Sequence, residues 1–415
     1  MLHMDTWAHA WSVLIVIFAG GLIVGKLCEK PRIPDVAGYL VYGILIGPAL
    51  LNWVSEPSQS NVNQFLLNFG ASLILFEGGR GVELGVLKKV WVSVSLLATL
   101  GVFVTAFVVG LTVHFVLGAP WLFSFLAGAV IASTDPATLI PVFKRVAIVS
   151  CLRQTVESES AFNDATATVL VATLLAASTA GGAIHIGHAV LTFVQSAGIG
   201  IVIGLVFGTA ALVLVSTKAW GIFHEFGSFV MLIAAIAAYQ VAVLLDASGF
   251  MATFVAGVIA GNAHVFGWKL QQHTQDNIHH FESSMTLMLR MMIFVLLGTQ
   301  VDFGMVSKYL WSGLVIVAVF MLIARPLTVF SSVWVDRRAK WQGREMAFMC
   351  WVRETGVIPA ALSGMLVAQG FPDADVIASI TFMAILLTIV IQASTTGLVA
   401  KRLGVLVPAG PEEEI

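Results

Sequence analysis

Thirteen apolar runs follow one another along this chain, and they restrict its possible folds more than any other feature. All but the ninth reach the length of about 17 residues that lets a helix cross the hydrocarbon core of a bilayer. Of all residues, 58% are hydrophobic and only 11% are charged, which excludes a soluble domain of this length. The runs lie near 8–27, 33–52, 63–79, 90–117, 121–143, 154–180, 188–216, 226–245, 247–262, 284–301, 309–335, 346–370 and 376–399.

We therefore predict an all-α polytopic membrane protein with about 13 transmembrane helices. A single transmembrane domain is expected over residues 1–400, with a short cytoplasmic tail over 401–415. When the loops are assigned to alternating sides, Lys308 is the one loop cation on one side, and the remaining loop Lys and Arg gather on the other. Because positive charge collects in cytoplasmic loops, the N-terminus is expected outside and the C-terminus inside. With no recognisable targeting segment, we expect a bacterial inner membrane.

Two of the predicted spans carry polar residues and prolines near their middles. The fifth contains Ser133-Thr134-Asp135-Pro136 and then Pro141, and the twelfth contains Arg353-Glu354-Thr355-Gly356 and then Pro359. Proline removes a backbone donor and disfavours helix in the residue before it, so both spans are expected to be broken helices. In an inverted repeat of spans 1–6 and 8–13 with span 7 linking, the fifth span corresponds to the twelfth, so both breaks fall at equivalent positions. In transporters such breaks mark the binding site.

The stretch ESESAFNDATATVL, residues 157–170, places three carboxylates in the sixth span. Asp164 is expected about 16 Å along the helix, near the bilayer midplane, where an ionisable side chain costs on the order of 3 kcal/mol. Ser160 and Asp164 share one helical stripe, and Glu159 and Asn163 share the neighbouring one. This free-energy cost favours the interpretation that the polar residues of the sixth span form a functional site.

A buried carboxylic acid prefers its neutral form, whereas a bound hard cation favours the ionised form. Proton and cation are therefore expected to compete for Asp164, with the hydroxyls of Thr134 and Ser160 and freed carbonyls as further oxygen ligands. Glu159 then needs a proton or a partner, for which Arg353 and Arg325 are the candidates.

Structural roles compete with these assignments. Asn163, Ser160 and Thr134 could each serve only as hydrogen-bonding residues between or within helices. For Arg353 a structural salt bridge is favoured over contact with a substrate. Glu77 is expected at an interface or in a cytoplasmic funnel. The His residues of segment 264–280 are expected in a solvated cytoplasmic loop, where a role in pH sensing is open.

The sequence resembles the NhaP/NHE-type monovalent cation/proton antiporters, the branch described as electroneutral. The resemblance covers nearly the whole chain. It rests on GYLVYGILIGPALL, LILFEGG, STDPATLIPVFKR, ESESAFNDATA, SGFMATFVAGVIAGN, FVLLGTQVD and RETGVIPAAL, which occur in the order typical of the family.

The resemblance implies that Asp164 is the essential cation- and proton-binding aspartate, preceded by the family's asparagine at Asn163. It implies that oxygens of Ser160 and Thr134 join Asp164 in coordinating Na⁺. Glu159 resembles a glutamate that approaches the ion through water and is held by an arginine.

For that arginine, Arg353 is the better match. The resemblance further implies one proton per cation, no cofactor and a homodimer. The chain departs from it at Glu354, where many members have glycine, and this extra acid could compete for Arg353.

We therefore predict that this protein is not an enzyme but a secondary antiporter exchanging Na⁺ or Li⁺ for H⁺ by alternating access. K⁺/H⁺ antiport and a sodium-coupled organic solute symporter of the same architecture are the alternatives. A symporter needs a roomier site in which one carboxylate does not serve competing ions. A gated channel would show no exchange stoichiometry. An intramembrane protease is disfavoured because the chain lacks a Gly-x-Gly-Asp motif.

Overall fold

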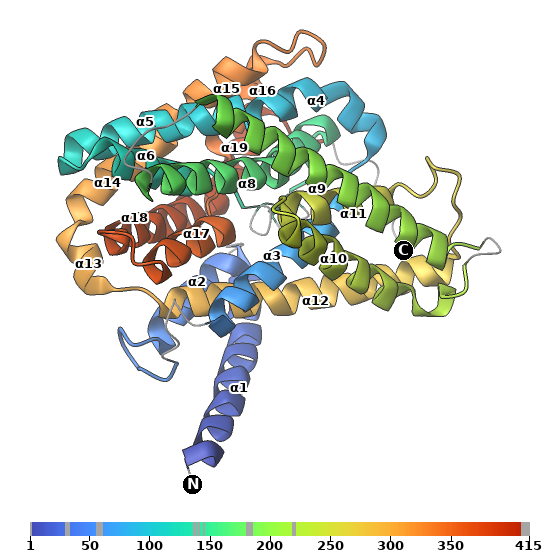
Figure 1. Ribbon diagram of the computed structural model, residues 1–415, viewed down its shortest axis with the longest axis horizontal. Coiled ribbons are helices and arrows are strands. Elements are labelled where there is room, and N and C mark those ends of the chain that lie inside the picture. The colour runs from blue at the N-terminus through green and yellow to red at the C-terminus, as the bar shows by residue number, and fades with distance from the viewer. Residues whose placement is uncertain are drawn as a thin grey trace.

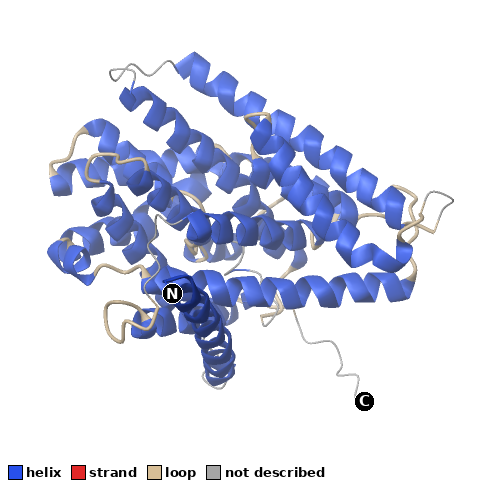
Figure 2. Cartoon of the chain, turned by 60° about the horizontal axis from the view of Figure 1, so that its bottom comes forward, coloured by secondary structure: helices blue, strands red, loops and turns tan. Residues whose placement is uncertain are grey.

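Helices account for almost all of the chain that the computed structural model describes, namely residues 2–29, 34–54, 61–135, 139, 142–143, 146–179, 186–217 and 221–407. Within these ranges the extended backbone pairs at one antiparallel bridge, between Ile148 and Leu406. Figure 2 shows this predominance of helix over short loops. The predicted all-α membrane class is confirmed.

A first group of helices packs around α11 and α12. Here α1, α3 and α12 lie with the glycine-rich pair α9 and α11. Glycine lets α9 approach α11 closely, because a Cβ at Gly204 would overlap the carbonyl oxygen of Ala252, and Gly208 meets Ala256 in the same way. The members are α1 Leu2–Glu29, α2 Asp35–Ile46, α3 Asn61–Arg80, α9 Ile186–Val215, η1 His224–Phe226, α10 Gly227–Leu244, α11 Gly249–Gly261 and α12 Gln272–Thr299.

A second group packs around α5, α6 and α8, and Figure 1 shows these three helices above α3 and α12. It contacts the first group chiefly where α8 and α17 meet α3, α9 and α11. Its members are α4 Leu84–Ala98, α5 Leu100–Leu117, α6 Trp121–Ile131, α8 Ser150–Thr179, α13 Phe303–Lys308, α14 Leu310–Val319, η2 Phe320–Ala324, α15 Arg325–Val333, α16 Gly343–Trp351, α17 Val357–Ala368, α18 Ala374–Leu387, η3 Thr388–Ala393 and α19 Ser394–Leu403. The segments η2 and η3 are single stretches of π-helix.

Each predicted apolar run coincides with helix in the described residues. Eight of these helical stretches are long and apolar enough to cross a membrane, and four shorter apolar helices, α2, α6, α11 and α17, lie among them. The count of thirteen spans, their orientation and the inverted repeat remain predictions. The cytoplasmic tail was predicted over 401–415, and its residues 408–415 lie outside the described ranges.

The predicted loop before the tenth span is partly wrong, because α12 already begins at Gln272. Thr274 and Ile278 are buried one turn apart, whereas His273, His279 and His280 are exposed on the same helix. Hydropathy detects only the apolar part of a helix whose first turns are amphipathic. Those histidines therefore lie on the polar face of α12.

Two helices are interrupted, as predicted for the fifth and twelfth spans. The first break is segment 132–135, after α6, and the second is segment 352–356, between α16 and α17. Pro359 lies in the first turn of α17, where its ring would clash with the carbonyl of Thr355 if the helix continued backward. Pro136 and Pro141, to which the first break was assigned, lie outside the described residues.

Candidate ion site at two crossing helix breaks

The first break lies against the middle of α8. The Asn163 side chain contacts Thr134 twice, because its Nδ2 donates to Thr134 Oγ1 at 2.7 Å and its Oδ1 accepts from the Thr134 backbone N–H at 3.2 Å. Beside them, the hydroxyl of Ser133 donates to Asp164 Oδ1. All four side chains are buried. The structure thus brings together three of the predicted site residues, Thr134, Asn163 and Asp164.

Two oxygens of this cluster have no hydrogen-bond partner among the described residues. They are Oδ2 of Asp164 and Oγ of Ser160, which lies one turn earlier on α8. Both residues are 0% exposed. A carboxylate oxygen and a hydroxyl are ligands that hard cations accept, and the carboxylate alternatively takes a proton. Thr168, which continues this stripe, donates its hydroxyl back to the carbonyl of Asp164 at 2.8 Å.

Glu159 pairs with Arg325, and this overturns the preference for Arg353. The guanidinium of Arg325 donates to both carboxylate oxygens of Glu159, at 2.5 and 3.0 Å. It also donates to the carbonyls of Met349 and Val352, at 2.8 and 3.2 Å, where α16 ends. Arg325 follows directly on the π-helical segment η2. The wider turn changes which residue of the span faces α8.

Arg353 lies in the second helix break and contacts the first one. Its guanidinium donates to the carbonyl of Ala132 at 2.5 Å, at the C-terminal end of α6, and its Cζ lies 5.0 Å from the centre of the Phe320 ring. A cation is favourable there because a helix C-terminus carries partial negative charge. The favoured structural salt bridge is therefore replaced by a contact between a cation and a helix end.

Asp135 and Glu354 lie where the two breaks cross. The Asp135 backbone N–H donates to the carbonyl of Glu354 at 2.8 Å. The Asp135 carboxylate lies against Gly356, which precedes the first residue of α17, so closely that a Cβ at Gly356 would overlap it. A helix N-terminus favours a negative charge. Asp135 and Arg353 thus complement the ends of two different half-helices.

Glu354 does not compete for Arg353. Its Oε1 faces the hydroxyl of Thr396 on α19 at 3.5 Å, and it forms no ion pair within the described residues. Its side chain is 0% exposed.

Ser133 is the contact that sequence reasoning missed. The sequence offered one signal for it, since Ser133 immediately precedes Thr134 in the segment predicted to unwind. In extended backbone, neighbouring side chains point to opposite sides. Both hydroxyls reach α8 here because the segment is irregular.

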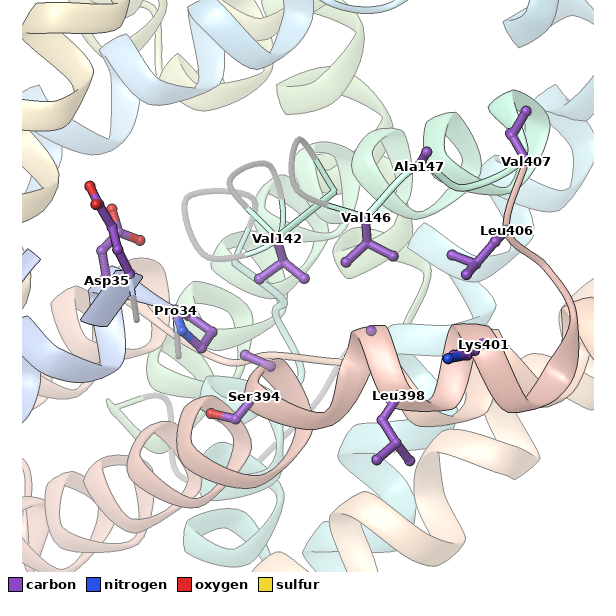
Figure 3. A pocket seen from close by; sticks show the side chains of 13 residues that line it. Pro34, Asp35, Val142, Val146, Ala147, Ser394, Leu398, Lys401, Leu406 and Val407 are labelled. Carbon is purple, nitrogen blue, oxygen red and sulfur yellow. The ribbon is translucent and has the colours of Figure 1, made fainter. Parts of the chain in front are cut away.

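Two of the cavities formed by the described residues lie away from this cluster and contain charged side chains. The larger, about 1100 Å³, separates the start of α2 from α19, and Figure 3 shows Asp35 on one side of it and Leu398 and Lys401 on the other. None of the described site residues lines it. The smaller, about 280 Å³, is lined by Glu77 together with Arg80 and Glu282, which form an ion pair, and by Arg153 and Glu157 of α8.

These features define a polytopic membrane protein whose buried carboxylate site lies at the crossing of two interrupted helices. The chain belongs to the sodium/hydrogen exchanger family, because the family model described as "Sodium/hydrogen exchanger, transmembrane" matches residues 13–402. This confirms the family expected from the sequence motifs.

Relatives resemble the chain over nearly its full length. Na(+)/H(+) antiporter 1 of Methanocaldococcus jannaschii is 30% identical over 420 residues, covering 95% of this chain and 96% of that protein. The K(+)/H(+) antiporter NhaP of Alkalimonas amylolytica is 26% identical, covering 97% of this chain and 68% of that protein. The structure of the sodium proton antiporter MjNhaP1 from M. jannaschii at pH 8 superposes with a TM-score of 0.81 at 28% identity, covering 95% of this chain and 98% of that one.

Proposed function

We propose that this protein exchanges Na⁺, or Li⁺, for H⁺ by alternating access, with both ions competing for Asp164. The observation that carries the proposal is the buried Asp164 carboxylate, which contacts the first helix break through Ser133 and whose Oδ2, like Oγ of Ser160 one turn earlier on α8, has no hydrogen-bond partner among the described residues. Names of the similar proteins support sodium as the cation. K⁺ is the second candidate, because other relatives are named K(+)/H(+) antiporters.

The charges around the site support one-for-one exchange. Glu159 and Arg325 neutralise each other, and Asp135 and Arg353 complement two helix ends. Among the described residues proposed for the ion site, Asp164 is then the one whose charge lacks a compensating partner when the site is empty and ionised. Moving such a charge through the low-dielectric interior is costly, so the empty site stays on its side, whereas the site neutralised by Na⁺ or H⁺ can change sides.

In this mechanism Thr134 and Ser160 supply oxygens to the cation, and Asn163 fixes the unwound segment through its two contacts with Thr134. Ser133 orients the Asp164 carboxylate. The Glu159–Arg325 pair ties α8 to α15 and to the end of α16.

Transport by purified protein in proteoliposomes tests the proposal. A proton gradient is imposed, Na⁺, Li⁺ or K⁺ is added, and the membrane potential is held at zero or at a fixed value. We expect the cation to collapse the gradient at a voltage-independent rate, Asp164→Asn to abolish the collapse, and Asp375→Asn, at an exposed position of α18, to preserve it. Normal exchange by Asp164→Asn would overturn the proposal.

We further propose that the protein is a homodimer in a bacterial inner membrane. Exposed apolar side chains on α1, such as Trp11, Ile15 and Leu22, offer a face for lipid or for a second copy. Cross-linking between single cysteines in native membranes tests the dimer.

A further inference from the structure

A second cluster of buried polar side chains lies where the break of the twelfth span meets the π-helical segment η3. Segment 352–356 contributes Glu354 and Thr355 to it, and η3 contributes Gln392. Within the described part of the chain, Oε2 of Glu354, Oγ1 of Thr355 and Oε1 of Gln392 have no hydrogen-bond partner. All three residues are at most 1% exposed. This cluster, the Glu354 pocket, includes none of the residues proposed to coordinate the cation.

Hydrogen bonds hold the walls of the Glu354 pocket together. Gln392 Nε2 donates to the carbonyl of Trp351 at 2.7 Å, and the Thr355 backbone N–H donates to Thr388 Oγ1 at 3.2 Å. Thr396 Oγ1 lies 2.8 Å from the Gln392 carbonyl and 3.5 Å from Glu354 Oε1. These bonds join η3 to the end of α16 and to the second break, and they join α19 to the break and to η3. The backbone and side chains around the Glu354 carboxyl group are therefore held in place by hydrogen bonds.

The charged groups around Glu354 are already engaged. Arg353, its neighbour, donates to the end of α6, and Arg325 of α15 holds Glu159. Asp135 approaches from the first break and is itself an acid. The residues of η3 and α19 that face the pocket, Gln392 and Thr396, carry no charge. An ionised Glu354 would therefore be a buried charge with no described ion-pair partner, a situation that proteins avoid by neutralising the group.

A proton suits the pocket. On Glu354 it would remove the charge and give the carboxyl group a donor, at a side chain whose Oε2 has no hydrogen-bond partner among the described residues. We propose that the Glu354 pocket is a second proton-binding site of this protein, which keeps its proton while Asp164 exchanges ions. Glu354 is thus a positioning residue: its neutral state leaves Arg353 on the Ala132 carbonyl and the first break in register with α8.

The effect of Glu354 on transport rests on the proposed function, whereas its protonation does not. With Glu354 neutral, the loaded second helix group carries no uncompensated buried charge, and exchange ignores voltage. With Glu354 ionised, the group would move one negative charge in each crossing, and Arg353 would gain a competing anion.

Infrared spectroscopy tests the proton directly, because a protonated carboxylic acid and a carboxylate have separate C=O stretches. The full-length protein carrying Asp164→Asn is compared with the same protein carrying Glu354→Gln in addition, so that Asp164 contributes no signal. We expect the second change to remove a protonated-acid band at neutral pH. The matched control, Glu225→Gln at an exposed position of η1, should leave that band in place.

Two spectroscopic results would overturn the inference. A protonated-acid region that Glu354→Gln leaves unchanged, with a carboxylate band lost instead, would mean that Glu354 is ionised. Loss of the band on adding Na⁺ to the Asp164→Asn protein would mean that the pocket gives up its proton to a cation.

Transport gives an independent readout. Glu354→Gln, which keeps the shape and donor of the protonated acid, should restore the voltage-independent exchange that Glu354→Ala impairs. A change in voltage dependence in Glu354→Gln would contradict a neutral Glu354. If the unaltered protein moved no protons on cation addition, the proposed function would fail, while the infrared difference would still report on Glu354.

Discussion

Replacing Arg325 by Met removes one partner of the fully buried ion pair with Glu159. Arg325 and Glu159 are 0% and 1% exposed, and two hydrogen bonds join them. Removing one partner of such a pair leaves an uncompensated buried charge, which costs about 3 to 5 kcal/mol. The carbonyls of Met349 and Val352 also lose a charged donor, each at about 1 to 3 kcal/mol. Arg325→Met is therefore expected to destabilise the fold by at least about 3 kcal/mol.

A second variant separates the charge from the packing. In Arg325→Met with Glu159→Gln, the uncompensated charge is gone and only the carbonyl contacts are lost. The double variant is therefore expected to be more stable than Arg325→Met alone, although it carries one more change. Neighbouring residues are expected to deviate from additivity by about 0.5 to 3 kcal/mol.

Unfolding in mixed micelles, followed by tryptophan fluorescence, measures these differences. Lys26→Met is the matched control, because its partner Glu29 lies in an exposed pair, for which less than about 1 kcal/mol is expected. If Arg325→Met cost no more than Lys26→Met, or if the double variant were less stable than Arg325→Met alone, the assignment of a stabilising buried pair would be wrong.

Three further predictions concern close packing and the ion site. Gly356→Ala should cost about 1 to 3 kcal/mol and impair exchange, because its Cβ would overlap the Asp135 carboxylate, whereas Gly343→Ala meets open space and should be neutral or stabilising in the same unfolding and transport assays. Gly204→Ala should destabilise by a similar amount through the Ala252 carbonyl, and Gly198→Ala should not; equal stability of the two would contradict the close packing of α9 on α11. Ser160→Ala should raise the Na⁺ concentration for half-maximal exchange by about tenfold, as expected for an interaction worth about 1.4 kcal/mol. Thr173→Ala on the same helix, whose hydroxyl bonds back to Val169, should leave that concentration unchanged, and an equal effect of the two would remove Ser160 from the site.

The sequence was sufficient for the parts of the site that follow from chain-local chemistry. Pro359 forces a break before α17, and the spacing of Ser160 and Asp164 places both on one stripe of α8. A carboxylate near the bilayer midplane can be recognised as a candidate functional group because burying it there costs free energy.

The side-chain contacts that Arg325 and Arg353 make with other helices could not be predicted from the sequence in the same way. Arg325 and Arg353 carry the same charge in neighbouring spans, and their contacts depend on the π-helical turn of η2 and on the crossing of the two breaks. A π-turn changes the helical phase without a sequence signature as strong as proline. Glu354, expected as a competitor for Arg353, instead accepts from Thr396 of α19, a contact between residues 42 positions apart in the chain.

Proton release on cation binding tests the central claim most directly. Na⁺ is added to purified protein in weakly buffered detergent, near the pH at which half of Asp164 is protonated, and the released protons and bound Na⁺ are counted. We predict that Na⁺ binding displaces protons, up to one per Na⁺ as the pH is lowered, and that Asp164→Asn shows neither binding nor release. Na⁺ binding without proton release, or release that persists in Asp164→Asn, would contradict competition at this carboxylate.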